Sequence, residues 1–167
     1  MIPVVLFVGK KKSGKTTFLE SVIAELSNKG YRVGTLKHHV HSSSPVDKEN
    51  TDSWKHQRAG ALIAGLSSRR GNCYFLKSED QWTIAHLCLP FEGKVDIVLG
   101  EGFKQEPYPK IEVFNSAIPG VPVCSADQYL IAVVSDIKTN LSVPHFDFSE
   151  AIRVVEFIET KYLVRNI

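Results

Sequence analysis

Cysteine and long apolar runs are scarce in this sequence. The 167 residues include three cysteines, Cys73, Cys88 and Cys124, which are too few and too widely spaced for a disulfide framework and form no CxxC pair for zinc. No stretch approaches the roughly 20 apolar residues of a membrane span, and no basic region or small-residue cleavage site accompanies the first apolar run. These absences predict a cytoplasmic protein without a membrane segment.

An excess of charge of one sign is lacking as well. The formal net charge is +2, and the chain offers no aromatic and basic platform of the kind that binds nucleic acid. Nucleic acid is therefore the least favoured partner. With 43% hydrophobic and 23% charged residues, the composition is that of a globular protein, and its length predicts one domain spanning residues 1–167.

Short apolar runs alternate with a helical pattern at the start of the chain. The run IPVVLFV at 2–8 indicates a strand buried on both faces of a parallel sheet. From Lys15, apolar residues recur at helical spacing until Gly30 ends the helix, and a second strand follows at 31–37. This order is that of a parallel crossover unit, so the sequence predicts an α/β fold with a mostly parallel central sheet flanked by helices.

The remaining elements follow from the same patterns. We expect helices at 52–59 and 149–163, and strands at 61–67, 72–77, 95–99, 110–114 and 130–134. The segment TIAHLCL at 83–89 fits either a helix or a strand. Asp147 and Glu150 are spaced as a capping box before the last helix. Its inward-facing residues are expected to be Ile152, Val155, Ile158 and Tyr162.

The segment GKKKSGKTT at 9–17 has the spacing of a phosphate-binding loop. Glycines permit the tight curvature that turns backbone N–H groups toward a phosphate, and the following helix adds its positive end. Lys15 is expected to reach the β- and γ-phosphates, and Thr16 to offer its hydroxyl to Mg²⁺. Because a strand precedes the segment and a helix follows it, we favour nucleotide binding over a basic surface turn. The expected contacts are Gly9, Ser13, Gly14, Lys15, Thr16 and Thr17, whereas Lys10, Lys11 and Lys12 are expected to be solvated or to strengthen the local field.

An acidic group near the loop is the other requirement of a magnesium site. Glu101 follows the apolar stretch VDIVLG, so it is expected at the carboxyl edge of the sheet, where open α/β sheets bind ligands. Asp96 lies earlier in the same run, and Glu101 is favoured over it. Gly102 is expected to allow close approach to a phosphate, to turn the chain out of the sheet, or to do both. Lys104 is expected either to contact phosphate or to be an ordinary surface lysine.

A polar segment, HHVHSSSPVDKENTDS at 38–53, reads as a long exposed loop. Lys37 and His38, at the carboxyl end of the second strand, are expected beside the nucleotide. Zinc binding by His38, His39 and His41 is disfavoured, because no clear fourth ligand accompanies them. Asp52 is expected either to contribute to the magnesium site or to cap the next helix.

Several strings resemble one family in both order and spacing. They are GKKKSGKTTF, GYRVGTLKHHVH, DSWKHQRAGA and DIVLGEGFKQEPYPKIEVF, and together they cover about residues 3–115. The chain resembles the molybdopterin-guanine dinucleotide biosynthesis protein B (MobB) family. The final third is similar only in its strand-then-helix pattern.

The resemblance implies a P-loop GTPase-like fold, a homodimer, Mg²⁺-dependent GTP binding with weak hydrolysis, and an auxiliary role in attaching GMP to molybdopterin. It implies the guanylyltransferase of that pathway (MobA) as partner, with a molybdopterin-type ligand possible. Lys37, His38, Asp52, Ser53 and Lys104 match further motif positions of the family. No catalytic base is assignable.

Guanine specificity has no readable signature of the NKxD type. Asp136, at the end of the run LIAVV, is expected either to accept from guanine N–H groups or only to form a turn.

Two other functions fit the phosphate loop. A small-molecule kinase needs a lid that carries arginines, and the adjacent pair Arg69 and Arg70 reads more readily as a polar turn. A nucleotide-dependent scaffold without relevant catalysis would instead use the triphosphate to order the segment 39–51.

Overall fold

The computed structural model describes residues 2–38, 47–76 and 82–163. Two compact units are distinguished: residues 1–38 with 87–167, and residues 39–86. The first unit carries the phosphate loop, and the second is a segment inserted into the first in sequence. Whether both belong to one domain stays a prediction.

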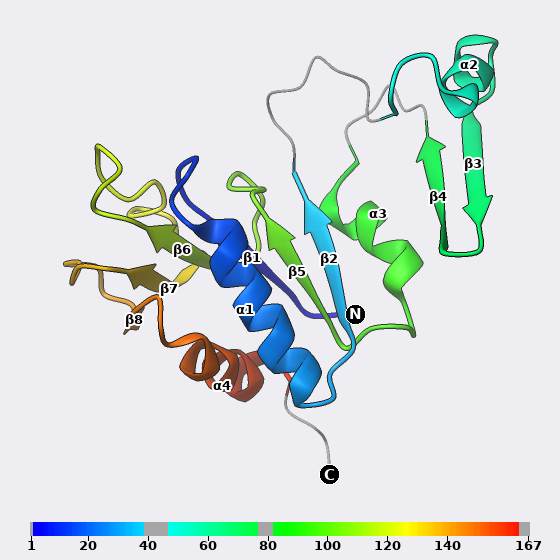
Figure 1. The fold of residues 1–167 in the computed structure, drawn as a ribbon. Coiled ribbons are helices and arrows are strands. Elements are labelled where there is room, and N and C mark those ends of the chain that lie inside the picture. Colours follow the sequence, from blue (N-terminus) through cyan, green and yellow to red (C-terminus); the bar gives the residue numbers. More distant parts are fainter. Residues whose placement is uncertain (1, 39–46, 77–81, 164–167) are drawn as a thin grey trace. The chain divides into compact units, whose positions relative to one another are not determined.

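A six-stranded sheet forms the centre of the first unit (Figure 1). Its order is β2-β5-β1-β6-β7-β8, and every neighbouring pair is parallel. The strands are β1 (Val4–Val8), β2 (Val33–Lys37), β5 (Ile97–Glu101), β6 (Lys110–Phe114), β7 (Leu130–Ser135) and β8 (His145–Phe146). The predicted parallel α/β fold is confirmed.

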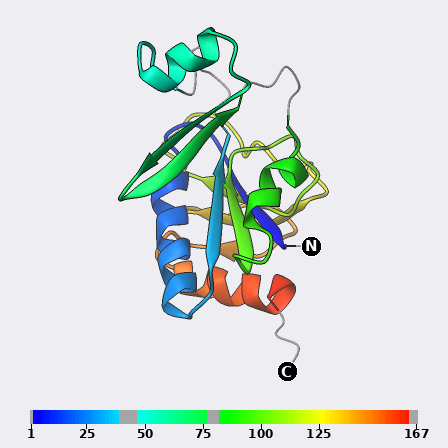
Figure 2. The same ribbon diagram turned by 90° about the vertical axis from the view of Figure 1, so that its right-hand side faces the viewer.

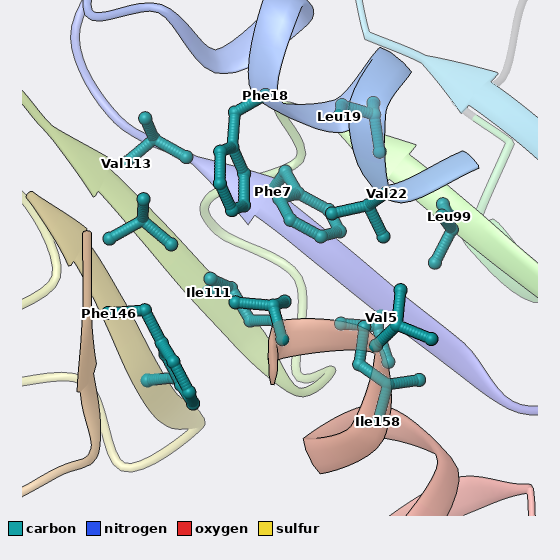
Figure 3. Close-up of a cluster of buried hydrophobic side chains, with 14 of the residues drawn as sticks. Val5, Phe7, Phe18, Leu19, Val22, Leu99, Ile111, Val113, Phe146 and Ile158 are labelled. Carbon is teal, nitrogen blue, oxygen red and sulfur yellow. The ribbon is translucent and has the colours of Figure 1, made fainter. Parts of the chain in front are cut away.

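Two helices of the first unit pack against each other on one face of this sheet (Figures 1 and 2). They are α1 (Lys15–Asn28) and α4 (Ala151–Tyr162). Phe7, Phe18 and Ile158 belong to the buried cluster between sheet and helices (Figure 3). The residues on the other face of β1, such as Leu6, are also buried, as a near-continuous apolar strand predicts. A short 3₁₀ helix, η1 (Leu89–Phe91), precedes β5.

The second unit contains a helix and a two-stranded hairpin. Helix α2 (Asp52–Arg58) begins after Thr51, whose hydroxyl accepts a hydrogen bond from Trp54 N at 3.3 Å. Strands β3 (Ile63–Ser68) and β4 (Gly71–Leu76) pair antiparallel, and Arg69 and Arg70 form the turn between them, as predicted. The segment at 83–89, whose sequence fits either a helix or a strand, forms a helix, α3 (Ile84–Cys88).

Three details differ from expectation. Strand β5 spans Ile97–Glu101, two residues later than the predicted 95–99; just before it, the Asp96 carboxylate pairs with Arg32 Nη2 at 2.8 Å. Strand β8 was not expected, since two residues carry no periodic signal. The predicted inward orientation of Ile152 was wrong: this residue is 53% exposed, and Val154 is buried instead. Glu150 Oε2 does accept from Asp147 N at 2.8 Å, which is one half of the expected capping box.

Candidate functional site

Strand order brings the predicted site residues of the first unit to one edge of the sheet. Strand β1 lies between β5 and β6, so the loop after Val8 emerges beside the carboxyl end of β5. In the parallel register, Glu101 lies opposite Phe7 on one side and Lys37 on the other. Residues far apart in sequence therefore meet where open α/β sheets bind their ligands.

The loop between β1 and α1 depends on glycine at both ends. Gly9 has φ +140° and Gly14 has φ +91°, a backbone region that side chains rarely adopt. Gly14 O accepts the first helical hydrogen bond, from Phe18 N at 2.9 Å. The N-terminus of α1, a 14-residue helix, thus opens directly onto the loop with its unpaired N–H groups.

Lys15 closes the loop from within. Its Nζ donates to the carbonyl oxygen of Lys10 at 2.6 Å. Burial lowers the pKa of Lys15, an effect that the nearby Glu101 carboxylate opposes and that Lys37 reinforces. The side chain lies in the loop that it is expected to serve, and an anion that gave Lys15 a counter-charge would stabilise its protonated form.

A cavity of about 380 Å³ lies over this loop. Ser13 contributes a buried hydroxyl with no hydrogen-bond partner. An unpaired buried polar group is costly, and a phosphate oxygen would relieve that cost. The residues that line the cavity are Lys11, Lys12, Ser13, Gly14, Lys15, Thr16, Thr17 and Glu101. The donor set therefore fits a polyphosphate.

Glu101 connects the loop to the neighbouring strands. Thr16 Oγ1 donates to Glu101 Oε1 at 2.9 Å, and Lys37 Nζ lies 3.2 Å from Glu101 Oε2. A threonine hydroxyl and a carboxylate are oxygen ligands of the kind that Mg²⁺ binds together with water and phosphate. The pair fits a magnesium ion that also contacts phosphate. No cluster of three or more His, Cys, Asp or Glu suited to a metal occurs among the described residues.

The backbone after Glu101 is tightly packed. Gly102 has φ +92°, and a side chain there would press on His38, whose Cβ lies 3.2 Å from the added atom. His38 N donates to Glu101 O at 2.9 Å, and its ring stacks on Phe103 with centroids 4.8 Å apart. Lys104 follows in the turn and is exposed. His38 thus joins the ends of β2 and β5, while Lys104 lines no part of the cavity.

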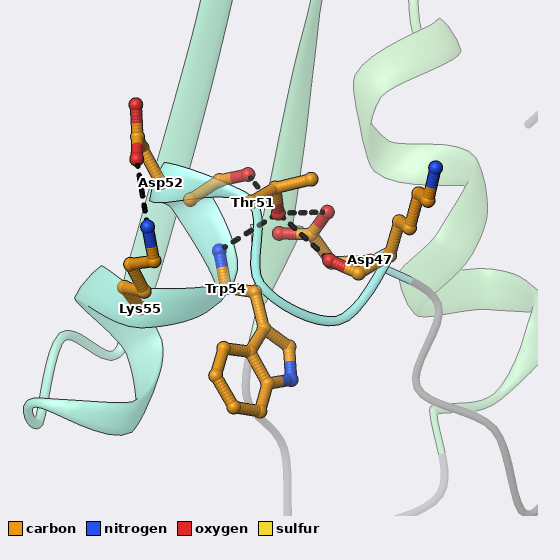
Figure 4. A network of polar contacts seen from close by, with 7 residues as sticks. Asp47, Thr51, Asp52, Trp54 and Lys55 are labelled. Atoms are coloured by element: carbon orange, nitrogen blue, oxygen red, sulfur yellow. Dashed lines mark hydrogen bonds and ion pairs between the residues drawn. The ribbon is translucent and has the colours of Figure 1, made fainter.

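Asp52 belongs to the second unit, where it begins α2. Its side chain is 90% exposed and pairs with Lys55 at 3.4 Å (Figure 4). Thr51 also donates to Asp47 Oδ1 at 3.0 Å, and the other oxygen of this buried carboxylate has no partner. The helix is capped by Thr51, and a magnesium role for Asp52 stays a prediction. His39 and His41 lie outside the described residues.

Some residues at or near the cavity had little or no signal in the sequence. Lys11 and Lys12 line it while remaining exposed, which agrees with their expected effect on the local field. Ser13 was included only as part of the loop, and nothing in its spacing foretold that its hydroxyl would be buried and unpaired. Phe148, which lies near Gly14, had no sequence signal. The roles of the individual site residues stay predictions.

Comparison with known proteins identifies the family. The model for "Molybdopterin guanine dinucleotide synthesis protein B" matches residues 4–136. The chain belongs to the MobB family.

Relatives from two bacteria match nearly the whole chain. A molybdopterin-guanine dinucleotide biosynthesis adapter protein of Haemophilus influenzae is 33% identical over 159 residues, covering 95% of this chain and 88% of the relative. The adapter protein of Escherichia coli K12 is 32% identical over 165 residues, covering 95% of this chain and 92% of the relative. The crystal structure of Bacillus subtilis MobB is 27% identical, with a TM-score of 0.70 over 96% of this chain and 98% of that one.

MobB membership agrees with the resemblance found in the sequence strings, and it extends that resemblance through β7. Within the described residues, no helix has both the length and the apolar character that crossing a membrane would require.

Proposed function

We propose that this MobB protein is a nucleotide-dependent adapter in molybdopterin-guanine dinucleotide synthesis. It binds GTP with Mg²⁺ at the loop 9–17 and assists the guanylyltransferase MobA in attaching GMP to molybdopterin. Two relatives that match nearly the whole chain carry the name adapter protein of this pathway. Its three free cysteines favour the cytoplasm as the place of action.

The unpaired Ser13 hydroxyl in a lysine-lined cavity is the observation that carries nucleotide binding. A bound triphosphate would give Ser13 an acceptor and draw Lys15 from the Lys10 carbonyl. Thr16 and Glu101 would hold Mg²⁺, which supplies charge neutralisation between the phosphates. Lys37 would keep Glu101 oriented through their ion pair.

Hydrolysis is expected to be slow. Positioning of an attacking water needs a group free to accept its proton. Among the described residues, Glu101 is the one carboxylate that lines the cavity, and each of its oxygens already contacts Thr16 or Lys37. An adapter that holds GTP without consuming it is consistent with this arrangement.

A calorimetric titration of Mg²⁺-GTP into wild type and two lysine variants tests nucleotide binding. Lys15→Ala removes a charged donor to phosphate, so it should weaken binding roughly 10- to 100-fold. Lys11→Ala removes an equal charge from an exposed position on the same loop and should change binding by about threefold or less. Glu101→Gln should weaken binding in Mg²⁺ but not in EDTA.

Equal affinities for wild type and Lys15→Ala would contradict the site. A lack of preference for GTP over ATP, together with no association with the guanylyltransferase, would contradict the function. Co-purification of the two proteins with GTP, GDP or no nucleotide measures that association directly.

Pairing with a second copy through the β3-β4 hairpin is part of the proposal. One face of the hairpin exposes Ile63, Tyr74 and Leu76, with exposed fractions of 58%, 70% and 44%. An isolated two-stranded sheet is marginally stable, and its open strand edges can pair with those of an identical hairpin. A homodimer would cover both the apolar face and the edges.

A further inference from the structure

Asp136 is held rigidly at the carboxyl edge of the sheet. It follows β7, and its Oδ1 accepts from Ser116 N at 2.8 Å. Its Oδ2 accepts from the Ser116 hydroxyl, and Ser135 Oγ lies 3.4 Å from Oδ1. Ser116 itself follows the end of β6. Two neighbouring strand ends therefore fix one exposed carboxylate in one orientation.

The surroundings of Asp136 are continuous with the phosphate loop. Lys10 Nζ donates to Pro119 O at 2.7 Å, so the loop after β6 is bonded to the phosphate loop. The Phe148 ring lies 3.3 Å from where a Cβ of Gly14 would be, so the loop after β8 packs there as well. Strand β7 is separated from β1 by β6 alone, which places the two strands about 10 Å apart. The α-phosphate, ribose and base of a loop-bound nucleotide together can span such a separation.

The carboxylate has acceptor capacity to spare. Ionised carboxylates offer about four lone-pair positions; Ser116 occupies two of them and the longer hydrogen bond from Ser135 Oγ uses a third, which leaves an open position on Oδ2. The hydrogen bonds from Ser116 lower the pKa of Asp136, so at neutral pH the group is an acceptor only. A ligand that meets Asp136 must therefore present donors.

Guanine and adenine differ in the hydrogen-bond donors that they present. Guanine presents two adjacent donors, N1–H and N2–H, to a carboxylate. Adenine presents one donor beside the N1 lone pair, which would face the negative charge. A fixed carboxylate therefore favours guanine, because binding adenine would set an acceptor against an acceptor.

We propose that Asp136 is the base-recognition residue of this chain and selects guanine nucleotides over adenine nucleotides. The inference rests on the proposed nucleotide binding at the loop 9–17. Ser116 is the positioning residue, since it sets the direction of the carboxylate without needing to touch the base.

Titrations of four Mg²⁺-bound nucleotides test the inference. Wild type should bind GTP at least tenfold more tightly than ITP, which lacks the N2 amine, and more tightly still than ATP. The affinity of Asp136→Asn for GTP should be roughly tenfold or more below that of wild type. Its affinity for XTP should rise, because the new amide N–H can donate to the 2-oxo group of xanthine. Its affinity for ATP should not fall.

Controls separate this inference from nucleotide binding itself. Asp96→Asn removes a carboxylate at the opposite end of the sheet, where it pairs with Arg32, and should keep the wild-type preference. Lys15→Ala should weaken the binding of all four nucleotides by similar factors. If wild type binds no nucleotide, the proposed function fails. If wild type binds GTP and ITP equally, or Asp136→Asn keeps the preference or weakens all nucleotides alike, the role of Asp136 alone is overturned.

Discussion

Gly9 shows how a single residue position determines the loop. A side chain at Gly9 would overlap the carbonyl oxygen of Val113 and approach Ser13 Oγ to 3.1 Å. The backbone also has φ +140°, which only glycine adopts without strain. The absent side chain lets the loop turn across the end of β6 and buries the Ser13 hydroxyl.

Gly9→Ala should therefore destabilise the protein by about 3 kcal/mol, from backbone strain and displacement of the Val113 carbonyl. Gly30→Ala is the matched control, because Gly30 also has positive φ (+84°) but has nothing within 4 Å of an added Cβ. Gly30→Ala should lower the free energy of unfolding by about 1 kcal/mol. Urea denaturation of both variants measures the difference, and equal losses would show that the Val113 contact carries no energy.

At the scale of elements, periodicity predicted the type of each long segment. The runs before Gly9 and around Ile111 indicated buried strands, and β1 and β6 occupy them. Pattern alone gave neither strand order nor side-chain partners. Lys110 and Glu112 in β6 are each 1% exposed, which their charge did not suggest.

Distant partners explain that burial. Lys110 Nζ pairs with Asp127 Oδ2 at 2.9 Å, and Glu112 accepts from Cys124 N at 2.8 Å. Such pairings are long-range, so no local window of sequence contains them. For the same reason, the sequence indicated the glycines and Lys15 of the loop but could not show that Glu101 would contact both Thr16 and Lys37.

The hairpin of the second unit is the element whose exposed face predicts self-association. Tyr74→Lys places a charge on this face and should weaken the dimer at least tenfold, because a buried unpaired charge is costly. Leu89→Lys is the control, since Leu89 is also exposed, at 59%, but lies in η1. Sedimentation over a range of concentrations measures both. Unchanged association of Tyr74→Lys, or equal disruption by Leu89→Lys, would place the interface elsewhere.

For the whole molecule, the two units differ in how much they bury. In the first unit, all five residues of β1 are buried, and Val5 and Phe7 belong to the core cluster with side chains from both helices and the sheet. In the second, the described buried residues are Asp47, Ala64 and Ile84. Local stability follows apolar burial, so the second unit should open at lower free energy than the first.

Hydrogen exchange at two protein concentrations tests this difference together with the dimer. Amides of β1 and β6 should exchange slowly and independently of concentration, because their opening requires unfolding of the first unit. Amides of β3 and β4 should exchange at least tenfold faster (about 1.4 kcal/mol less protection), and faster again on dilution, since pairing of hairpins protects their strand edges. In Tyr74→Lys, the dilution effect should vanish while β1 is unchanged. Equal protection of β1 and β3 in diluted protein would show instead that both units open as one.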